Sequence, residues 1–121
     1  MSKRDVEEFL TKCKIAASLQ ISLDWTDDNI ETITDLGYTE DDVLDEILGL
    51  SVENYVDGPT QDRDGYANDY WIFGKKIDCK EIYIKIKIRN LDDDGNKQLS
   101  IFCKSFHYTK RPINYPYGKN S

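Results

Sequence analysis

The residues of this 121-residue chain that are best suited to chemistry gather in its C-terminal half. His107 is the only histidine, and histidine is the side chain that exchanges protons near neutral pH. The neighbours expected to converge on it are Tyr83, Lys85, Lys75 and Arg63. RNA cleavage without a metal needs this set: a base for the 2′-hydroxyl proton, an acid for the leaving 5′-oxygen, and cations for the phosphate charge. A lone histidine is more often a partly buried polar residue, so its role depends on these neighbours.

The strand expected at Glu81–Arg89 must position several of these side chains. Its isoleucines alternate strictly with polar residues, which is the period-two pattern of a strand with one buried face. The polar positions are Tyr83, Lys85, Lys87 and Arg89. They lie about 7 Å apart at the usual strand rise, a spacing suited to phosphates. A polar face that simply meets solvent is the common alternative.

Three amphipathic helices are predicted before any firm strand. They span about Lys3–Leu19, Thr26–Leu36 and Thr39–Leu48. Thr26 and Thr39 are suited to cap the second and third helices, which Gly37 and Gly49 close. The connecting segment 20–24 is either a connector or a short strand.

The C-terminal half predicts an antiparallel meander. A polar stretch with two glycines and a proline, Val56–Asp69, predicts a long loop. Strands at Tyr70–Ile77, Glu81–Arg89 and Lys97–Phe106 follow, with Gly95 supplying a positive φ in the hairpin 90–96. The face parity around Cys103 stays open, because His107 shares a face with Lys85 only if both phenylalanines, 102 and 106, join the isoleucines or a bulge intervenes. The tail from residue 107 is expected to lie across the sheet.

Helices followed by a meander predict an α+β fold, with N-terminal helices packed on an antiparallel β-sheet. We expect one domain over residues 1–121, divided into a mainly helical part (1–55), a loop (56–69), and a sheet with its tail (70–117).

Charge divides the chain into two opposite halves. Residues 1–57 hold 15 acidic and 4 basic side chains, whereas residues 58–121 hold 8 and 12. The basic half can meet a polyanion although the net charge is −7. The absence of a long apolar run and of a leader-like start predicts a cytoplasmic protein that does not enter a membrane. Three widely spaced cysteines predict thiols rather than disulfides or a zinc site.

Neither a metal nor a cofactor is expected. The aspartates of LDDDGN resemble the start of a calcium loop, but the twelfth position counted from Asp92 is Cys103 rather than glutamate. No glycine-rich phosphate loop, GxSxG motif or Cys/His pair at recognisable spacing is found.

A series of short motifs between Leu48 and Tyr117 resembles a known family. In order they are GPTQDRDG, WIFGK, EIYIKIKI, SFH and YPY. The series is similar to the MqsR-type toxins of type II toxin–antitoxin systems, which are ribosome-independent mRNA interferases. The resemblance implies a RelE-like fold, metal-independent cleavage of single-stranded mRNA, and a cognate antitoxin as protein partner.

The resemblance also bears on individual residues. Tyr83 matches a strand tyrosine that the family uses at its active site, and His107 stands where the better-known member has a lysine. The family's lysine after the tyrosine that precedes the loop is absent, because Tyr55 is followed by valine. Arg63 or Lys75 is the conjectured substitute.

The leading hypothesis is therefore a toxin acting as an mRNA endoribonuclease that does not bind DNA by itself. His107 would serve as acid or base, Tyr83 as its partner, and three cations would hold charge: Lys85, Lys75 and Arg63. The RNA contacts would come from Lys87, Arg89, Trp71, Tyr115 and Tyr117, whose aromatic members are equally suited to a core. The alternative is a non-enzymatic interaction protein, such as a phage-borne inhibitor, whose acidic segment 24–57 mimics nucleic acid or docks on a basic partner.

Overall fold

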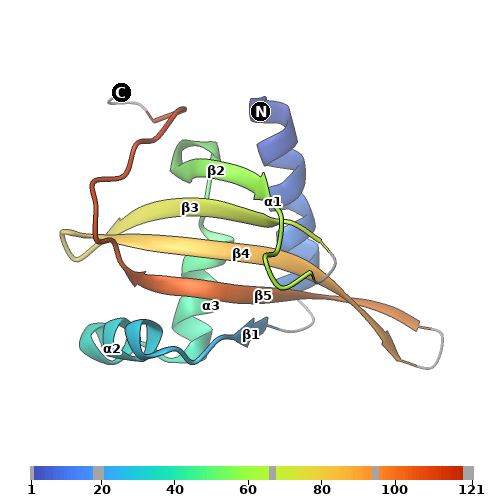
Figure 1. Ribbon diagram of the computed structural model, residues 1–121, viewed down its shortest axis with the longest axis horizontal. Helices are drawn as coiled ribbons and strands as arrows, with labels where there is room; N and C mark the ends of the chain where they lie inside the picture. The colour runs from blue at the N-terminus through green and yellow to red at the C-terminus, as the bar shows by residue number, and fades with distance from the viewer. Residues whose placement is uncertain (1, 18–20, 66–67, 94–95, 119–121) are drawn as a thin grey trace.

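The computed structural model describes residues 2–17, 21–65, 68–93 and 96–118. It has the α+β fold that the sequence predicts, with three helices packed on a five-stranded sheet (Figure 1). The helices are α1 (Lys3–Ala17), α2 (Asp27–Leu36) and α3 (Glu40–Leu48), followed by a 3-10 turn, η1 (Val52–Asn54). The strands are β1 (Ile21–Leu23), β2 (Tyr55–Thr60), β3 (Tyr70–Ile77), β4 (Lys80–Asp93) and β5 (Asn96–Tyr108). None of the described helices is long and apolar enough to cross a membrane.

The predicted helix caps of α2 and α3 are confirmed. The Thr26 hydroxyl accepts a hydrogen bond from the Asn29 amide at 3.3 Å, which satisfies one of the free N–H groups at the start of α2. The helix ends at Gly37, whose φ of 70° lies in the left-handed region. Thr39 and Asp42 form a capping box at the start of α3. The last residues predicted for the first helix, and Gly95, lie outside the described residues.

The sheet is mixed, so the purely antiparallel sheet predicted from the sequence is wrong at one edge. The strand order is β1-β5-β4-β3-β2, and β1 pairs with β5 in parallel through Ile21 and Ile101. All other neighbours are antiparallel. The sequence left residues 20–24 between a connector and a short strand, because three residues carry little periodicity and their partner lies 80 positions away.

The segment predicted as one loop, Val56–Asp69, begins with strand β2. This strand is irregular, with register shifts on both sides of Asp57, and so lacks the alternation by which strands are recognised. Gly58 has a φ of 114°, and a Cβ there would lie 2.9 Å from the Tyr70 carbonyl oxygen. Glycine therefore permits the close approach of β2 to β3.

The core lies between the sheet and the helices α1 and α3, which both cover the same face (Figure 1). We call this the inner face and the opposite one the outer face. The side chains of Ile82, Ile84 and Ile86 are completely buried on the inner face, as the alternation predicts. Helix α2 instead docks along β5, where buried Asn29 accepts a hydrogen bond from the Phe106 amide at 2.9 Å.

Candidate functional site

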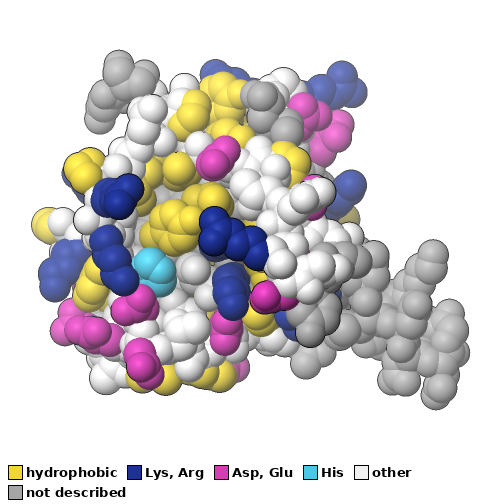
Figure 2. Space-filling model, in the orientation of Figure 1, with side chains coloured by type: hydrophobic (Ala, Val, Ile, Leu, Met, Phe, Trp, Pro, Cys, Tyr) yellow, Lys and Arg dark blue, Asp and Glu magenta, His cyan; other side chains and the backbone are white. Residues whose placement is uncertain are grey.

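The candidate site lies on the outer face, where His107 of β5 and Tyr83 of β4 are direct cross-strand partners. Their rings stack with centroids 5.5 Å apart and planes inclined by 19°. Figure 2 shows this face, on which dark-blue Lys and Arg side chains gather on both sides of the cyan histidine. The structure thus brings together the two residues that the sequence placed at the centre of its hypothesis.

A bulge in β5 puts His107 on this face. Lys85 pairs with Ser105, but the next β4 residue, Ile86, pairs with Cys103, which leaves Lys104 as the extra residue. The parity of β5 changes at that point, so Cys103 and Phe106 both point inward and are fully buried. Of the two solutions left open for the parity, the bulge is the one found.

The surroundings of His107 define which of its nitrogens is available. Nδ1 lies 3.0 Å from the carbonyl oxygen of Tyr108, and a carbonyl only accepts hydrogen bonds, so Nδ1 carries the proton. In the neutral ring Nε2 is then unprotonated and can act as a base. Burial, and secondly the charge of Asp57, raises the pKa of Tyr83, so its hydroxyl stays protonated near neutral pH.

A shallow groove of about 220 Å³ runs past this pair and brings in residues that the sequence analysis did not assign. It is lined by Tyr83, His107, Thr109, Lys110 and Arg111. The Thr109 amide donates to the Glu81 carbonyl at 3.0 Å and so fixes the start of the tail against β4. The adjacent cations in HYTKR were the available signal, since residues that follow a strand directly stay close to its last side chain.

A second groove of about 310 Å³ continues from the first, because Tyr83, Thr109 and Arg111 line both. Asp57 of β2 and Pro112 of the tail contribute to its far wall. The site is therefore an elongated, open depression rather than a closed pocket, a shape that suits an extended chain.

Further cations lie beside the stacked pair on the outer face. Lys85 follows Tyr83 by two residues on β4 and therefore shares its face. Its pKa is lowered, first by burial and then by the charges of Arg63 and Lys104. Like charges have thus been brought within range of one another, as in a site that receives an anion.

Two candidate residues of β3 are on the wrong face for the proposed site. Trp71 pairs with Ile86 and Lys75 with Ile82, so the register places both with the isoleucines on the inner face. The Trp71 ring stacks on Phe9 of α1 at 4.5 Å, and Lys75 forms an ion pair of 3.2 Å with Glu46 of α3. Neither side chain can share an RNA phosphate or base with His107.

Lys87 and Arg89 lie on the outer face, as predicted, but other residues engage them. The Lys87 side chain is 1% exposed and its Nζ lies 2.6 Å from a carboxylate oxygen of Asp62. The Arg89 guanidinium lies 3.7 Å from the ring centroid of Phe102. The expectation that Lys87 contacts RNA is therefore wrong, because the segment after β2 folds over this part of the strand.

Tyr115 and Tyr117 attach the tail to the sheet. The Tyr115 hydroxyl donates to a carboxylate oxygen of Glu81 at 3.2 Å, and burial with this contact raises its pKa to about 12. Its ring also packs on Gly74, where a Cβ would lie 2.7 Å from the hydroxyl. Tyr117 stacks on Tyr55 at 5.7 Å. Both tyrosines hold the predicted crossing of the sheet rather than a free stacking surface.

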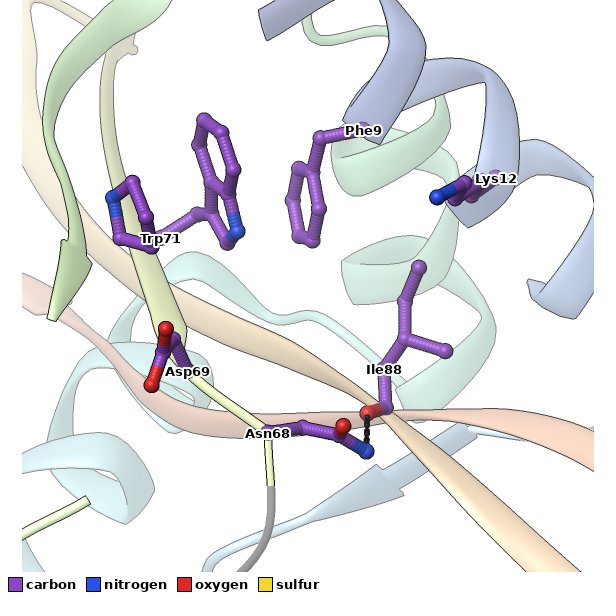
Figure 3. Close-up of a pocket in the computed structure, with 7 residues that line it drawn as sticks. Phe9, Lys12, Asn68, Asp69, Trp71 and Ile88 are labelled. Carbon is purple, nitrogen blue, oxygen red and sulfur yellow. Dashed lines mark hydrogen bonds between the residues drawn. The ribbon is translucent and has the colours of Figure 1, made fainter. Parts of the chain in front are cut away.

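A separate cavity lies away from His107, on the inner side between α1 and the sheet. It has a volume of about 490 Å³ and includes the stacked rings of Phe9 and Trp71, with Ile88 on its floor and Lys12 at its rim (Figure 3). Asn68 closes one side and donates to the Ile88 carbonyl at 2.8 Å. None of the predicted catalytic residues lines it.

In residues 2–17, 21–65, 68–93 and 96–118, no three side chains of the His, Cys, Asp and Glu types are grouped closely enough to hold a metal ion. Comparisons of the chain with protein-family models, with curated proteins and with solved structures gave no match. The likeness to MqsR-type toxins therefore rests on the sequence motifs alone.

Proposed function

We propose that this protein is a metal-independent endoribonuclease with a RelE-like fold, the toxin of a type II toxin–antitoxin system that acts on single-stranded mRNA in the cytoplasm. The observation that carries the proposal is the Tyr83–His107 stack in an open groove whose wall holds Lys110 and Arg111. A histidine base, a protonated phenol and several cations are the groups that metal-free RNA cleavage requires.

In the proposed reaction, Nε2 of His107 takes the proton from a ribose 2′-hydroxyl, and the 2′-oxygen attacks the adjacent phosphorus. The bond to the 5′-oxygen breaks and a 2′,3′-cyclic phosphate forms. Tyr83 gives the leaving 5′-oxygen its proton, and solvent afterwards takes the proton from His107 and returns one to the Tyr83 oxygen, which restores both groups. The cations Lys85 and Arg111 stabilise the additional negative charge on the phosphate in the transition state.

The proposed reaction implies two partner preferences. DNA lacks the 2′-hydroxyl and is not cleaved, although its backbone carries the same charge. A cognate antitoxin would inhibit by covering the outer face or by distorting it, because the groove is open and lies at the surface.

The alternative of an acidic nucleic-acid mimic has less support. Carboxylates of the acidic segment are already paired with lysines of the sheet and tail: Asp24 with Lys104, Asp28 with Lys110, Asp35 with Lys80, and Glu46 with Lys75. Part of the acidic charge therefore compensates the protein's own basic half rather than facing a partner.

The test is cleavage of a single-stranded RNA oligonucleotide by the purified protein in the presence of a chelator. The wild type should produce 2′,3′-cyclic phosphate ends, and His107→Ala should lower the rate by about 10²- to 10⁴-fold, the usual contribution of a general base. Tyr83→Phe should slow cleavage without affecting folding. The double charge reversal Asp27→Lys/Asp41→Lys on the acidic helices is the matched control and should cleave normally.

Two outcomes contradict the proposal. If the wild type neither cleaves RNA nor arrests growth on induction, the protein is not such a toxin. If His107→Ala is fully active while the reversals on the acidic helices abolish the cellular effect, the interaction protein is the correct alternative.

A further inference from the structure

The segment that follows β2 is tied to the outer face by a buried ion pair. A carboxylate oxygen of Asp62 lies 2.6 Å from Nζ of Lys87, and the two side chains are 5% and 1% exposed. Ion pairs so little exposed are rare, and breaking one leaves a buried charge without compensation. This contact joins residues 25 positions apart and holds the segment down on β4.

Other contacts make the attachment rigid. The Asp64 amide donates to the second Asp62 oxygen at 2.9 Å, and the Gly65 amide donates to the Asp62 carbonyl at 3.1 Å, which closes a tight turn. Nζ of Lys87 also lies 4.7 Å from the ring centroid of Tyr70. Asp62 thus organises the turn with its carboxylate and its backbone together.

The turn presents Arg63, the residue directly after Asp62, to the cations of the outer face. Arg63 is exposed and directly follows Asp62, whose carboxylate contacts Lys87. Nζ of Lys85 lies 4.9 Å from the centroid of the same Tyr70 ring that Lys87 contacts, and the charge of Arg63 contributes to lowering the pKa of Lys85. Lys104, the extra residue of the β5 bulge, acts on Lys85 in the same direction. Among the described residues Arg63 and Lys85 form no ion pair with a carboxylate, whereas Lys104 is paired with Asp24 at 2.9 Å.

We propose that the buried Asp62–Lys87 pair positions Arg63 so that Arg63, Lys85 and Lys104 together bind a backbone phosphate next to the one at His107. The identity of the polyanion as single-stranded RNA rests on the proposed function; the clamp and the anion subsite rest on the geometry. Asp62 and Lys87 are positioning residues in this arrangement and do not touch the ligand. Lys85 would contact both phosphates, since it follows Tyr83 by two residues on β4 and its Nζ lies over the Tyr70 ring beside the Asp62–Lys87 pair.

If the Asp62–Lys87 ion pair acts as a clamp that holds Arg63 in place, removing the Asp62 charge should change the affinity for a polyanion in the direction opposite to that expected from charge alone. Asp62→Asn removes a negative charge from a surface that binds a polyanion, which by itself should tighten binding. If Asp62 holds Arg63 in place, the same substitution must weaken binding, because the turn is released and Arg63 leaves the subsite. The sign of the change therefore decides between the two.

The experiment measures binding of a single-stranded 2′-O-methyl RNA oligonucleotide, which has no free 2′-hydroxyl and cannot be cleaved, as a function of salt. For the wild type log K should fall with log salt, and Arg63→Ala should reduce the slope by about 0.7, the value of one phosphate contact on a single strand. Asp62→Asn should reduce it by the same amount. The double variant Asp62→Asn/Arg63→Ala should bind no more weakly than Arg63→Ala, because Asp62 acts through Arg63.

Lys14→Ala, on the exposed side of α1, is the matched control for loss of one positive charge and should leave the slope unchanged. Folding of each variant is checked by thermal unfolding. If Asp62→Asn is unfolded, Asp62→Asn/Lys87→Met replaces it, since this variant leaves no single charge buried. It should show the same weakened binding through the loss of the clamp.

The inference is overturned if Asp62→Asn, or its replacement, binds as tightly as the wild type or more tightly, or if the wild type does not bind the oligonucleotide. The inference and the proposed function can fail independently of each other. Salt-dependent binding with the predicted variant effects but no RNA cleavage would sustain the subsite and reject the nuclease. His107-dependent cleavage of RNA, with no effect of Asp62→Asn on binding, would support the nuclease and reject the subsite.

Discussion

The inner and outer faces of the sheet are built from the same strands but follow different rules. Along β4, Ile82, Ile84 and Ile86 on the inner face are completely buried in the core with α1 and α3, whereas Tyr83 and Lys85 on the outer face remain partly exposed. On β5 the adjacent residues Phe106 and His107 divide in the same way. One face is fixed by apolar packing, and the other carries charged side chains and the His107 ring.

Three lysines show what this division means for function. Lys75 is on the inner face and is paired with Glu46, and Lys87 is on the outer face but is buried with Asp62. Lys85 lies on the outer face two residues from Tyr83, where its Nζ is 4.9 Å from the Tyr70 ring centroid, and it has no ion pair among the described residues. A cation on a strand is therefore available to a ligand only if both its face and the segments above that face allow it.

The largest effect expected from this comparison is on stability. Phe106→Ala removes a completely buried ring from the inner face and should lower the free energy of unfolding by about 3–5 kcal/mol. Phe102→Ala is the matched control on the same strand, because this partly exposed ring on the outer face contacts the Arg89 guanidinium and the Tyr70 ring instead of the core. Its expected cost is about 1 kcal/mol. Denaturant unfolding measures both values, and equal losses would contradict the difference between the faces.

Much of the fold was readable from the sequence, because its signals are local. The caps at Thr26 and Thr39 and the alternation of Glu81–Arg89 each depend on residues within one element. Strand β2 was missed because its bulges break the alternation, and the parallel pairing of β1 with β5 depends on a partner far along the chain.

The site was predicted only in part, for the same reason. Tyr83 and His107 do meet, but this required a bulge at Lys104 that was named only as a possibility. Lys75 and Trp71 were misplaced because the register of β3 against β4 is set by nonlocal packing. The burial of Lys87 depends on the position of a turn outside the sheet, and the alternation of residues along the strand does not predict that position.

A smaller effect is expected on activity. Lys85→Met should slow RNA cleavage by roughly 100-fold, the usual cost of losing one group that stabilises transition-state charge. Lys75→Met removes the same charge from the inner face and should change the rate less than about twofold, because its Nζ contacts Glu46 instead of the groove. Single-turnover cleavage of one RNA oligonucleotide by both variants tests the assignment of faces. A large loss of cleavage rate in Lys75→Met would show that Lys75 belongs to the active site and that the assignment of faces is wrong.

The smallest effect is on the pH dependence of stability. The hydrogen bond from Lys87, and then that from the Asp64 amide, lowers the pKa of Asp62 in the folded state. Asp62 therefore contributes stability that is complete above the ordinary aspartate pKa of about 3.9 and is lost as pH falls through the lowered value. Asp62→Asn should be less stable than the wild type at neutral pH and should take up fewer protons on acid unfolding, by at most about one. Thermal unfolding of both proteins across the acid range measures this difference. The inner-face variant Phe106→Ala should keep the acid dependence of the wild type, and an unchanged proton uptake in Asp62→Asn would show that the pair on the outer face is not formed in solution.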